Sequence, residues 1–349
     1  MTRTRLIAFA LLLLLVGGAW WAMRHGARFD VHAFWQQLHH VDFRLIAVGI
    51  LLIYTTFFFR AFRWAVFMRA HQRVAALSLV GPQFVGFTAV ALFGRIADLS
   101  RPYLLAQKTR TPLPLQVAVY TIERMFDLGA AAIVFSSALA FTPHDMPHHE
   151  VFVRVGIGSL AGTLLLAAFA TAMRVAGVAT AALVRRMLSR VSNSFGAAVE
   201  DKLLGFRLGL NAISSFSDFA ITATLSLVMW FLIAMAYKET ANAFLDTPSL
   251  ATLTISRTML LMAASIGGSL LQLPVLGWFT QIATTAAAMH GFYGTPLEPA
   301  TACGALLLVV TFLCIIPTGL VFARLDRVSL GDLTRTESNT PHASSEVSS

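Results

Sequence analysis

Three charged residues inside an apolar stretch, Glu123, Arg124 and Asp127, have the types and spacing that could do chemistry. Glu123 and Asp127 are four residues apart and share one face of a helix, while Arg124 is three residues before Asp127 and can neutralise it. The apolar run after them, residues 128–141, spans roughly 21 Å as a helix and is too short to cross a hydrocarbon core of about 30 Å. The spanning helix must therefore begin near residues 117–121 and carry the charges into the membrane.

Charges at that depth are costly unless they face a partner or a water-filled cavity, so their presence indicates a functional site. A lipid head group carries a phosphate and often an amine or a sugar. A site that moves one needs arginine side chains for the phosphate and carboxylates for amines or hydroxyls. The alternative interpretation is a buried ion pair that only locks the packing of helices.

The composition indicates a membrane protein with several spans. Of the 349 residues, 57% are hydrophobic and only 12% charged, which excludes a soluble globular protein. The formal charge of +9 comes mainly from Arg and Lys at the ends of apolar segments, as the positive-inside rule requires. Nucleic-acid binding explains this charge less well, and we expect no nucleic-acid partner. We expect a bacterial inner membrane as the location, with both termini cytoplasmic.

Apolar segments and their basic flanks predict the topology. We expect a first, uncleaved helix because Trp20 and Trp21 stand where a signal peptidase needs small residues. Six full crossings are predicted, at residues 6–23, 44–59, 116–141, 152–173, 216–237 and 299–323. Residues 1–327 are expected to form a single integral membrane domain, and residues 328–349 a disordered cytoplasmic tail.

Two further apolar segments are interrupted by Gly and Pro. Residues 77–94 contain Gly81, Pro82 and Gly86, and basic residues on both flanks predict that this segment enters from the cytoplasm and returns. Residues 250–289 are interrupted near Gly267-Gly268 and by Pro274 and Gly277, which predicts two half-helices entering from outside. The fold class is therefore an all-α polytopic membrane protein with about six full transmembrane helices plus two broken or re-entrant segments. Eight full spans are the alternative. Interrupted segments in both halves point to a substrate site near the midplane.

Three short motifs resemble a known family. The first motif is Arg60-Ala61-Phe62-Arg63-Trp64, the second runs from Gly94 to Leu105 with Arg95, Asp98 and Arg101, and the third is Glu123-Arg124-Met125-Phe126-Asp127. In this order they resemble the signature of the lysylphosphatidylglycerol synthase transmembrane-region family. The resemblance covers roughly residues 5–325. It implies a flippase-like integral membrane domain that handles lipid head groups in cell-envelope lipid or glycolipid pathways.

The sequence also departs from the family pattern. Ala97-Asp98 replaces a Gly-Glu pair, which keeps the carboxylate but shortens its reach. Near the second interrupted segment the family's Gly-Gly pair is lost, and Gln281 replaces a carboxylate. The first half of the predicted site therefore resembles the family more closely than the second, and the segment from Pro274 to Gln281 could bind a different substrate or have lost its role.

The predicted substrate-binding residues are mixed charges beside the first interrupted segment: Arg95, Asp98, Arg101, Glu123, Arg124 and Asp127, with Arg60 and Arg63 from the early motif. The alternative for Arg60, Arg63, Arg95 and Arg101 is that they anchor helix ends at the membrane surface.

We predict a translocase for a lipid or lipid-linked head group, with an anionic lipid or lipid-linked molecule as substrate and envelope-lipid biosynthesis enzymes as further partners. The alternatives are a polyprenyl-sugar-dependent glycosyltransferase, with Asp30 and Asp42 as candidate acids, or a non-transporting subunit of a lipid-biosynthesis complex. No catalytic motif is found, so we expect no enzyme activity and no cofactor. The histidines near residues 144–150 are expected to lie in an exposed loop and not in a metal site.

Overall fold

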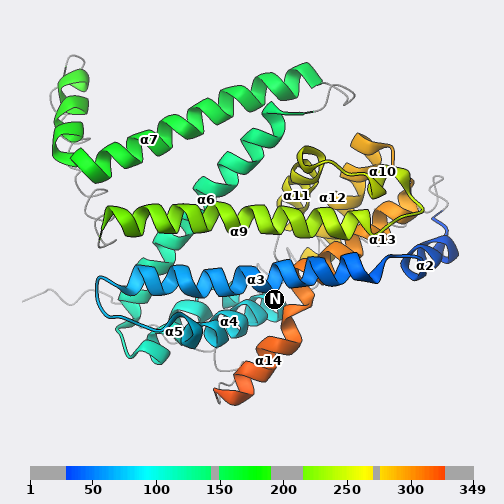
Figure 1. Ribbon diagram of the computed structural model, residues 1–349, viewed down its shortest axis with the longest axis horizontal. Helices are drawn as coiled ribbons and strands as arrows, with labels where there is room; N and C mark the ends of the chain where they lie inside the picture. Colours follow the sequence, from blue (N-terminus) through cyan, green and yellow to red (C-terminus); the bar gives the residue numbers. More distant parts are fainter. Residues whose placement is uncertain (1–28, 143–148, 190–214, 270–275, 327–349) are drawn as a thin grey trace, which may run out of the picture.

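The computed structural model describes residues 29–142, 149–189, 215–269 and 276–326, and these residues form helices without any strand (Figure 1). The helices in chain order are α2 (Val31–His39), α3 (Phe43–Met68), η1 (Ala76–Leu79), α4 (Val80–Phe93), η2 (Gly94–Ala97), α5 (Ser100–Thr109), α6 (Leu113–Ala140), α7 (His149–Leu188), α9 (Phe216–Asn242), α10 (Pro248–Ala251), α11 (Ile255–Ser269), α12 (Leu276–Tyr293), α13 (Leu297–Leu308), η3 (Val309–Leu313) and α14 (Ile315–Leu325).

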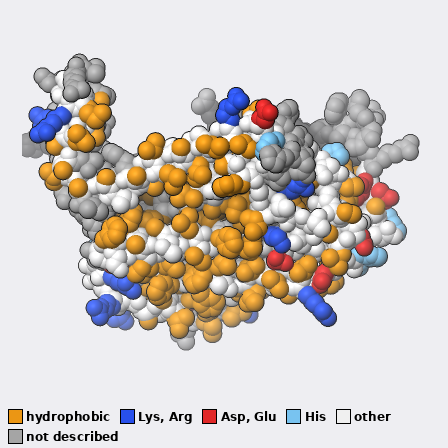
Figure 2. All heavy atoms as spheres, turned by 45° about the horizontal axis from the view of Figure 1, so that its top comes forward, with side chains coloured by type: hydrophobic (Ala, Val, Ile, Leu, Met, Phe, Trp, Pro, Cys, Tyr) orange, Lys and Arg blue, Asp and Glu red, His pale blue; other side chains and the backbone are white. Residues whose placement is uncertain are grey.

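The fold is that of a polytopic helical membrane protein, as predicted. Within the described residues, five helical segments are long and apolar enough to cross a membrane: Phe43–Met68, Ala76–Phe93, His149–Ala168, Phe216–Asn242 and Leu297–Leu325. Helix α6 has 28 residues, about 42 Å, and is the long helix that carries the charged triplet. The predicted crossing at residues 6–23 and the predicted tail at 328–349 lie outside the described residues. On the face shown in Figure 2, apolar side chains form a broad band with charged side chains gathered around its edges.

The first interrupted segment folds as a hairpin of two short helices. Helix α4 ends at Gly94, whose φ of 73° suits glycine, and the chain turns through η2 and returns as α5, which packs against α4. The sequence placed the break at Gly81, Pro82 and Gly86, and this position is wrong. Pro82 lies in the first turn of α4, where a missing N–H costs little. Gly86 lies within α4 and leaves room for the side chain of Arg101.

The second interrupted segment is also a pair of helices, α11 and α12, which pack closely against each other. A Cβ atom on Gly268 would collide with the side chain of Thr284, so the small residue permits this close approach. The connection at residues 270–275, which includes Pro274, lies outside the described residues. In Figure 1 the α4–α5 hairpin lies at the end of the bundle where α3 ends, and the α11–α12 hairpin lies toward the opposite end, where α9 ends.

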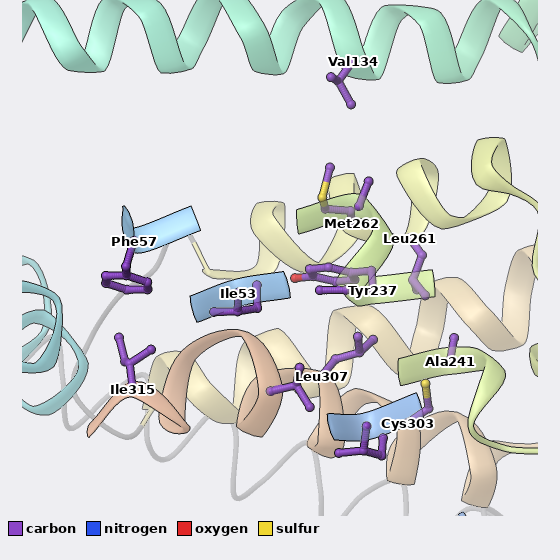
Figure 3. Close-up of a cluster of buried hydrophobic side chains, with 14 of the residues drawn as sticks. Ile53, Phe57, Val134, Tyr237, Ala241, Leu261, Met262, Cys303, Leu307 and Ile315 are labelled. Carbon is purple, nitrogen blue, oxygen red and sulfur yellow. The ribbon is translucent and has the colours of Figure 1, made fainter. Parts of the chain in front are cut away.

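The core that holds these hairpins lies around α3 and α9, which run side by side along the long axis (Figure 1). Apolar side chains from α3, α9, α11, α13 and α14 converge there, including Ile53, Tyr237 and Leu307 (Figure 3). The rings of Phe57 and Phe84 stack with their centroids 4.3 Å apart and join α3 to α4. The last predicted crossing is interrupted by η3, a π-helical turn closed by the hydrogen bond from Cys314 N to Val309 O at 2.8 Å.

Candidate functional site

One face of α6 carries a stripe of polar side chains, because Gln116, Tyr120, Glu123 and Asp127 recur at intervals of three and four residues. The side chains of Gln116, Glu123 and Asp127 are buried in the protein. Trp64 of α3 donates its indole N–H to Gln116 Oε1 at 2.9 Å, which fixes α3 beside this face. The stripe therefore points into the bundle, toward α3 and the α4–α5 hairpin.

Arg63 of α3 connects the two carboxylates of α6. Its Nη2 donates to Glu123 Oε1 at 2.7 Å, and its Nη1 donates to Asp127 Oδ1 at 2.7 Å and to Ser226 Oγ at 2.6 Å. The residue is fully buried, with 0% exposure. This burial contradicts the alternative that Arg63 is a surface anchor. The planar guanidinium is the group whose geometry allows it to hold two carboxylates on one helix face.

Arg101 reaches the same cluster from α5. Its Nη2 donates to Glu123 Oε2 at 3.2 Å and its Nη1 to Gln83 Oε1 at 3.4 Å. The guanidinium lies over the rings of Phe87 and Tyr120, 4.4 Å and 4.9 Å from their centroids. Cation–π contacts of this kind stabilise a charge that has left water. Arg101 is buried too, so it is a part of the cluster and not a surface anchor.

Arg60 and Arg124 complete the cluster on its open side. Arg124 Nη2 lies 3.1 Å from Asp127 Oδ2, the neutralising pair expected from their spacing, and 3.5 Å from Glu123 Oε2. Arg60 Nη1 lies 3.8 Å from Asp127 Oδ2 and 3.9 Å from Glu123 Oε1, too far for hydrogen bonds. Arg60 Nη1 and Arg124 Nη2 are both buried atoms without a hydrogen-bond partner. Each therefore has donor capacity that the protein does not use.

These two arginines and Asp127 line a cavity of about 680 Å³. Its walls come from α3, α6, α9 and the π-helical turn, and both hairpins reach it, α4 with Val90 and Ala91 and α12 with Gln281. Glu123 is fully buried and is not among the lining residues, so it supports the cavity wall from behind. The cluster thus divides into a buried support of Arg63, Arg101 and Glu123 and a cavity face of Arg60, Arg124 and Asp127.

The remaining predicted residues lie at the tip of the first hairpin. Asp98 is partly buried and is a hydrogen-bond partner of Tyr120, the residue of α6 whose ring also contacts Arg101. The backbone of Arg95 lies in η2, and its side chain lies outside the part of the chain that the structure describes. Ion pairs therefore bring together six of the eight predicted residues. Asp98 is connected to this cluster through Tyr120, and the position of the Arg95 side chain stays a prediction.

The lining that comes from α9, α12 and the π-helical turn includes a group of neutral polar residues that the sequence did not predict as a group. Tyr237 of α9 donates its hydroxyl to Ser265 Oγ at 2.9 Å, and Gln281 of α12 donates to the same oxygen at 3.1 Å. Tyr237, Gln281 and Thr311 line the cavity, Thr311 from the π-helical turn. Only Gln281 stood out in the sequence, because it replaces a carboxylate in a resembling motif. Single Tyr and Thr residues in apolar helices are too common to give a signal.

Two other predicted groups have different roles or positions. Asp30 and Asp42, the candidate acids of a glycosyltransferase, accept hydrogen bonds from backbone N–H groups at the starts of α2 and α3. Both carboxylates therefore act as helix caps. In the described part of the chain no group of three or more His, Cys, Asp or Glu side chains is placed to hold a metal ion. The predicted histidine loop at residues 143–148 is not described.

The helical bundle, its two opposed hairpins and the buried ionic cluster define a polytopic membrane protein with an internal polar site. Comparison with known families then assigns the chain: it belongs to the Lysylphosphatidylglycerol synthase TM region family, whose sequence model matches residues 6–319. This confirms the family predicted from the three motifs and ties the protein to lipid handling. No significant match was found among curated proteins or solved structures.

Proposed function

We propose that this protein moves an anionic lipid or lipid-linked head group between the leaflets of a bacterial inner membrane, in service of cell-envelope lipid metabolism. The observation that carries the proposal is the face of Arg60, Arg124 and Asp127 on an internal cavity between two opposed hairpins. No covalent step is proposed, because nothing in the cluster resembles a nucleophile held by a general base.

The charge balance of the cluster favours an anion. Four arginines (Arg60, Arg63, Arg101 and Arg124) are ion-paired with two carboxylates (Glu123 and Asp127), a formal excess of two positive charges that the nearby Asp98 reduces to one. A phosphate group offers negative charge and several acceptor oxygens, and arginine donors bind it in a directed way. The unused donors of Arg60 and Arg124 lie where such a group would enter.

The position of the cavity favours a lipid over a soluble anion. Leu128 lines the cavity, lies near the middle of α6 and is 72% exposed. We therefore propose that the cavity borders the outer face of α6 and that this face lies at the depth of the hydrocarbon core. A phosphate on an acyl or prenyl chain can enter there while its tail stays in the bilayer, whereas a free anion would have to cross hydrocarbon.

The two hairpins supply a route for exchange between leaflets. Short helices reach the cavity from opposite ends of the bundle. In transporters, broken helices form the substrate site near the midplane, and access alternates when one half of the protein rocks against the other around that site. We propose that the α4–α5 hairpin enters from the cytoplasm and the α11–α12 hairpin from outside, with both termini cytoplasmic, because basic residues flank the first hairpin.

The proposal is tested by reconstituting the protein into vesicles that contain fluorescent phosphatidylglycerol. The rate at which the label becomes accessible to an impermeant quencher should exceed that of protein-free vesicles, and Arg60→Gln should reduce it at least about tenfold, since one lost charge-assisted hydrogen bond is of that order. Exposed Arg73→Gln is the matched control and should leave the rate unchanged. Equal rates with and without protein would exclude phosphatidylglycerol exchange.

The alternative functions predict different results in a deletion strain. A translocase leaves the lipid product present but on the wrong side of the membrane, and a glycosyltransferase leaves the product absent. A non-transporting subunit would not speed lipid exchange between the leaflets of reconstituted vesicles, and its deletion would change the amount of lipid product in cells.

A further inference from the structure

The cavity has two chemically different sides, and this difference restricts the head group it can accept. Arg60, Arg124 and Asp127 form the ionic side, on α3 and α6. Tyr237, Gln281 and Thr311 form a neutral side, on α9, α12 and the π-helical turn. A head group that fills the cavity must offer a negative charge to the first side and uncharged hydrogen-bonding groups to the second.

Each carboxylate oxygen of Glu123 and Asp127 is already ion-paired with an arginine. Asp127 Oδ1 accepts a hydrogen bond from Arg63 at 2.7 Å, and Asp127 Oδ2 forms an ion pair, without a hydrogen bond, with Arg124 Nη2 at 3.1 Å. Both oxygens of Glu123 are likewise within 3.2 Å of an arginine, Oε1 of Arg63 and Oε2 of Arg101. An ammonium group would therefore have to displace an arginine or enter beside unpaired positive charge, and either arrangement is costly in a buried site.

The second hairpin supplies no acid either. Residues 255–293 contain neither Asp nor Glu, and this includes the connection at residues 270–275. In the described lining of the cavity, Asp127 is the one acidic residue. The position where an amine could have met a carboxylate is occupied by Gln281, which instead bonds to Ser265 beside Tyr237.

The neutral side is suited to hydroxyl groups. Tyr237 and Thr311 donate their hydroxyl hydrogens to Ser265 Oγ and Leu307 O, so their oxygens can serve as acceptors. The Gln281 amide has a second N–H and an oxygen, so the group can match an alcohol or a sugar hydroxyl, which both donates and accepts. Trp230 and Trp278 also line the cavity and offer flat apolar surface beside these polar groups. Together with the arginines, these residues would suit a phosphate that carries a polyol.

We infer, on the basis of the proposed function, that the substrate is an anionic phospholipid or lipid-linked phosphate whose head group carries hydroxyls and no amine. Glycerol and sugar phosphates belong to this class. Ethanolamine and aminoacyl head groups are rejected.

The test compares two lipids in two assays. Vesicles with the reconstituted protein should exchange fluorescent phosphatidylglycerol at least about tenfold faster than fluorescent phosphatidylethanolamine, the ratio for one charge-assisted contact. In detergent, short-chain phosphatidylglycerol should bind more tightly than short-chain phosphatidylethanolamine. Free glycerol phosphate should compete weakly; if it binds as tightly as the lipid, the ligand is a soluble phosphate and the lipid substrate is overturned.

The variant Gln281→Glu places a carboxylate on the neutral side and should narrow or reverse the preference for phosphatidylglycerol. Gln107→Glu makes the same change on the exposed surface of α5 and should leave the preference intact. Equal exchange and equal binding of the two lipids by the unmodified protein would overturn the selectivity and leave the translocase standing. Tighter binding of phosphatidylglycerol without exchange of either lipid would support the selectivity and overturn the translocase.

Discussion

At the scale of residues, the charges of α6 have different roles although they are neighbours in the sequence. Glu123 is fully buried, whereas the side chain of Arg124 is 38% exposed and lines the cavity. The difference follows from the helix: Glu123 and Asp127 point at Arg63 of α3, and Arg124 is rotated by about 100° from Glu123. Burial thus separates a supporting group from a group that can contact a substrate.

Arg63→Gln should destabilise the fold. The variant removes two ion pairs and the hydrogen bond to Ser226 and leaves the two carboxylates with the remaining arginines. Removing one partner from a buried charged network costs about 3–5 kcal/mol. The measurement is thermal unfolding in detergent micelles. The control is Arg73→Gln, the same substitution at an exposed arginine. Identical unfolding midpoints for the two variants would contradict the supporting role.

The sequence indicated most of this cluster, because charges inside apolar segments are rare enough to stand out. It did not indicate that Arg63 is the centre, since an arginine after a long apolar segment has the same pattern whether it anchors the helix end or turns inward. The neutral side of the cavity was harder to predict from the sequence than the ionic cluster. Tyr237 and Thr311 become meaningful only once the π-helical turn and α9 are known to face the same cavity.

At the scale of elements, the two hairpins depend on small residues at the places where helices touch. Gly86 accommodates Arg101 between α4 and α5, and Gly268 accommodates Thr284 between α11 and α12. Glycines in the sequence were interpreted as breaks, and the break of the first hairpin was misplaced for this reason. A glycine that allows close helix packing and a glycine that ends a helix cannot be told apart without the contact partner. The actual end of α4 is marked by the positive φ of Gly94.

The neighbouring glycines of α11 offer a direct test of this packing. Gly268→Ala should destabilise the protein by about 1–3 kcal/mol, because its Cβ would overlap the side chain of Thr284. Gly267→Ala meets nothing within 4 Å and should be neutral or stabilise the helix by up to about 1 kcal/mol. Thermal unfolding of both variants in the same detergent is the measurement. If both alanines behave alike, the close packing of α11 on α12 is not what fixes the hairpin.

At the scale of the whole molecule, the hairpins lie toward opposite ends of the bundle, and the basic residues that flank the first hairpin predict which end faces the cytoplasm. Cysteine placed at Gln107, on α5, should resist an impermeant thiol reagent in intact cells, and cysteine placed at Asp246, before α10, should react. Both positions are exposed, and the native Cys303 and Cys314 are free thiols that must be replaced first. Labelling of Gln107→Cys from outside would reverse the orientation, and labelling of both would contradict the arrangement of the hairpins.

The central claim is that the cavity face of the cluster contacts the head group while the buried part supports the fold. It is tested most directly by measuring lipid exchange and thermal unfolding on the same preparations of Arg124→Gln and Glu123→Gln. The free energy of unfolding of Arg124→Gln should lie within about 1 kcal/mol of that of the unmodified protein, since a partly exposed ion pair contributes little. The same variant should lose phosphatidylglycerol exchange. Glu123→Gln should lower the unfolding midpoint first, because Arg63 and Arg101 lose a shared buried partner. Full exchange by Arg124→Gln with a lowered midpoint would contradict the claim and leave the cluster as packing alone.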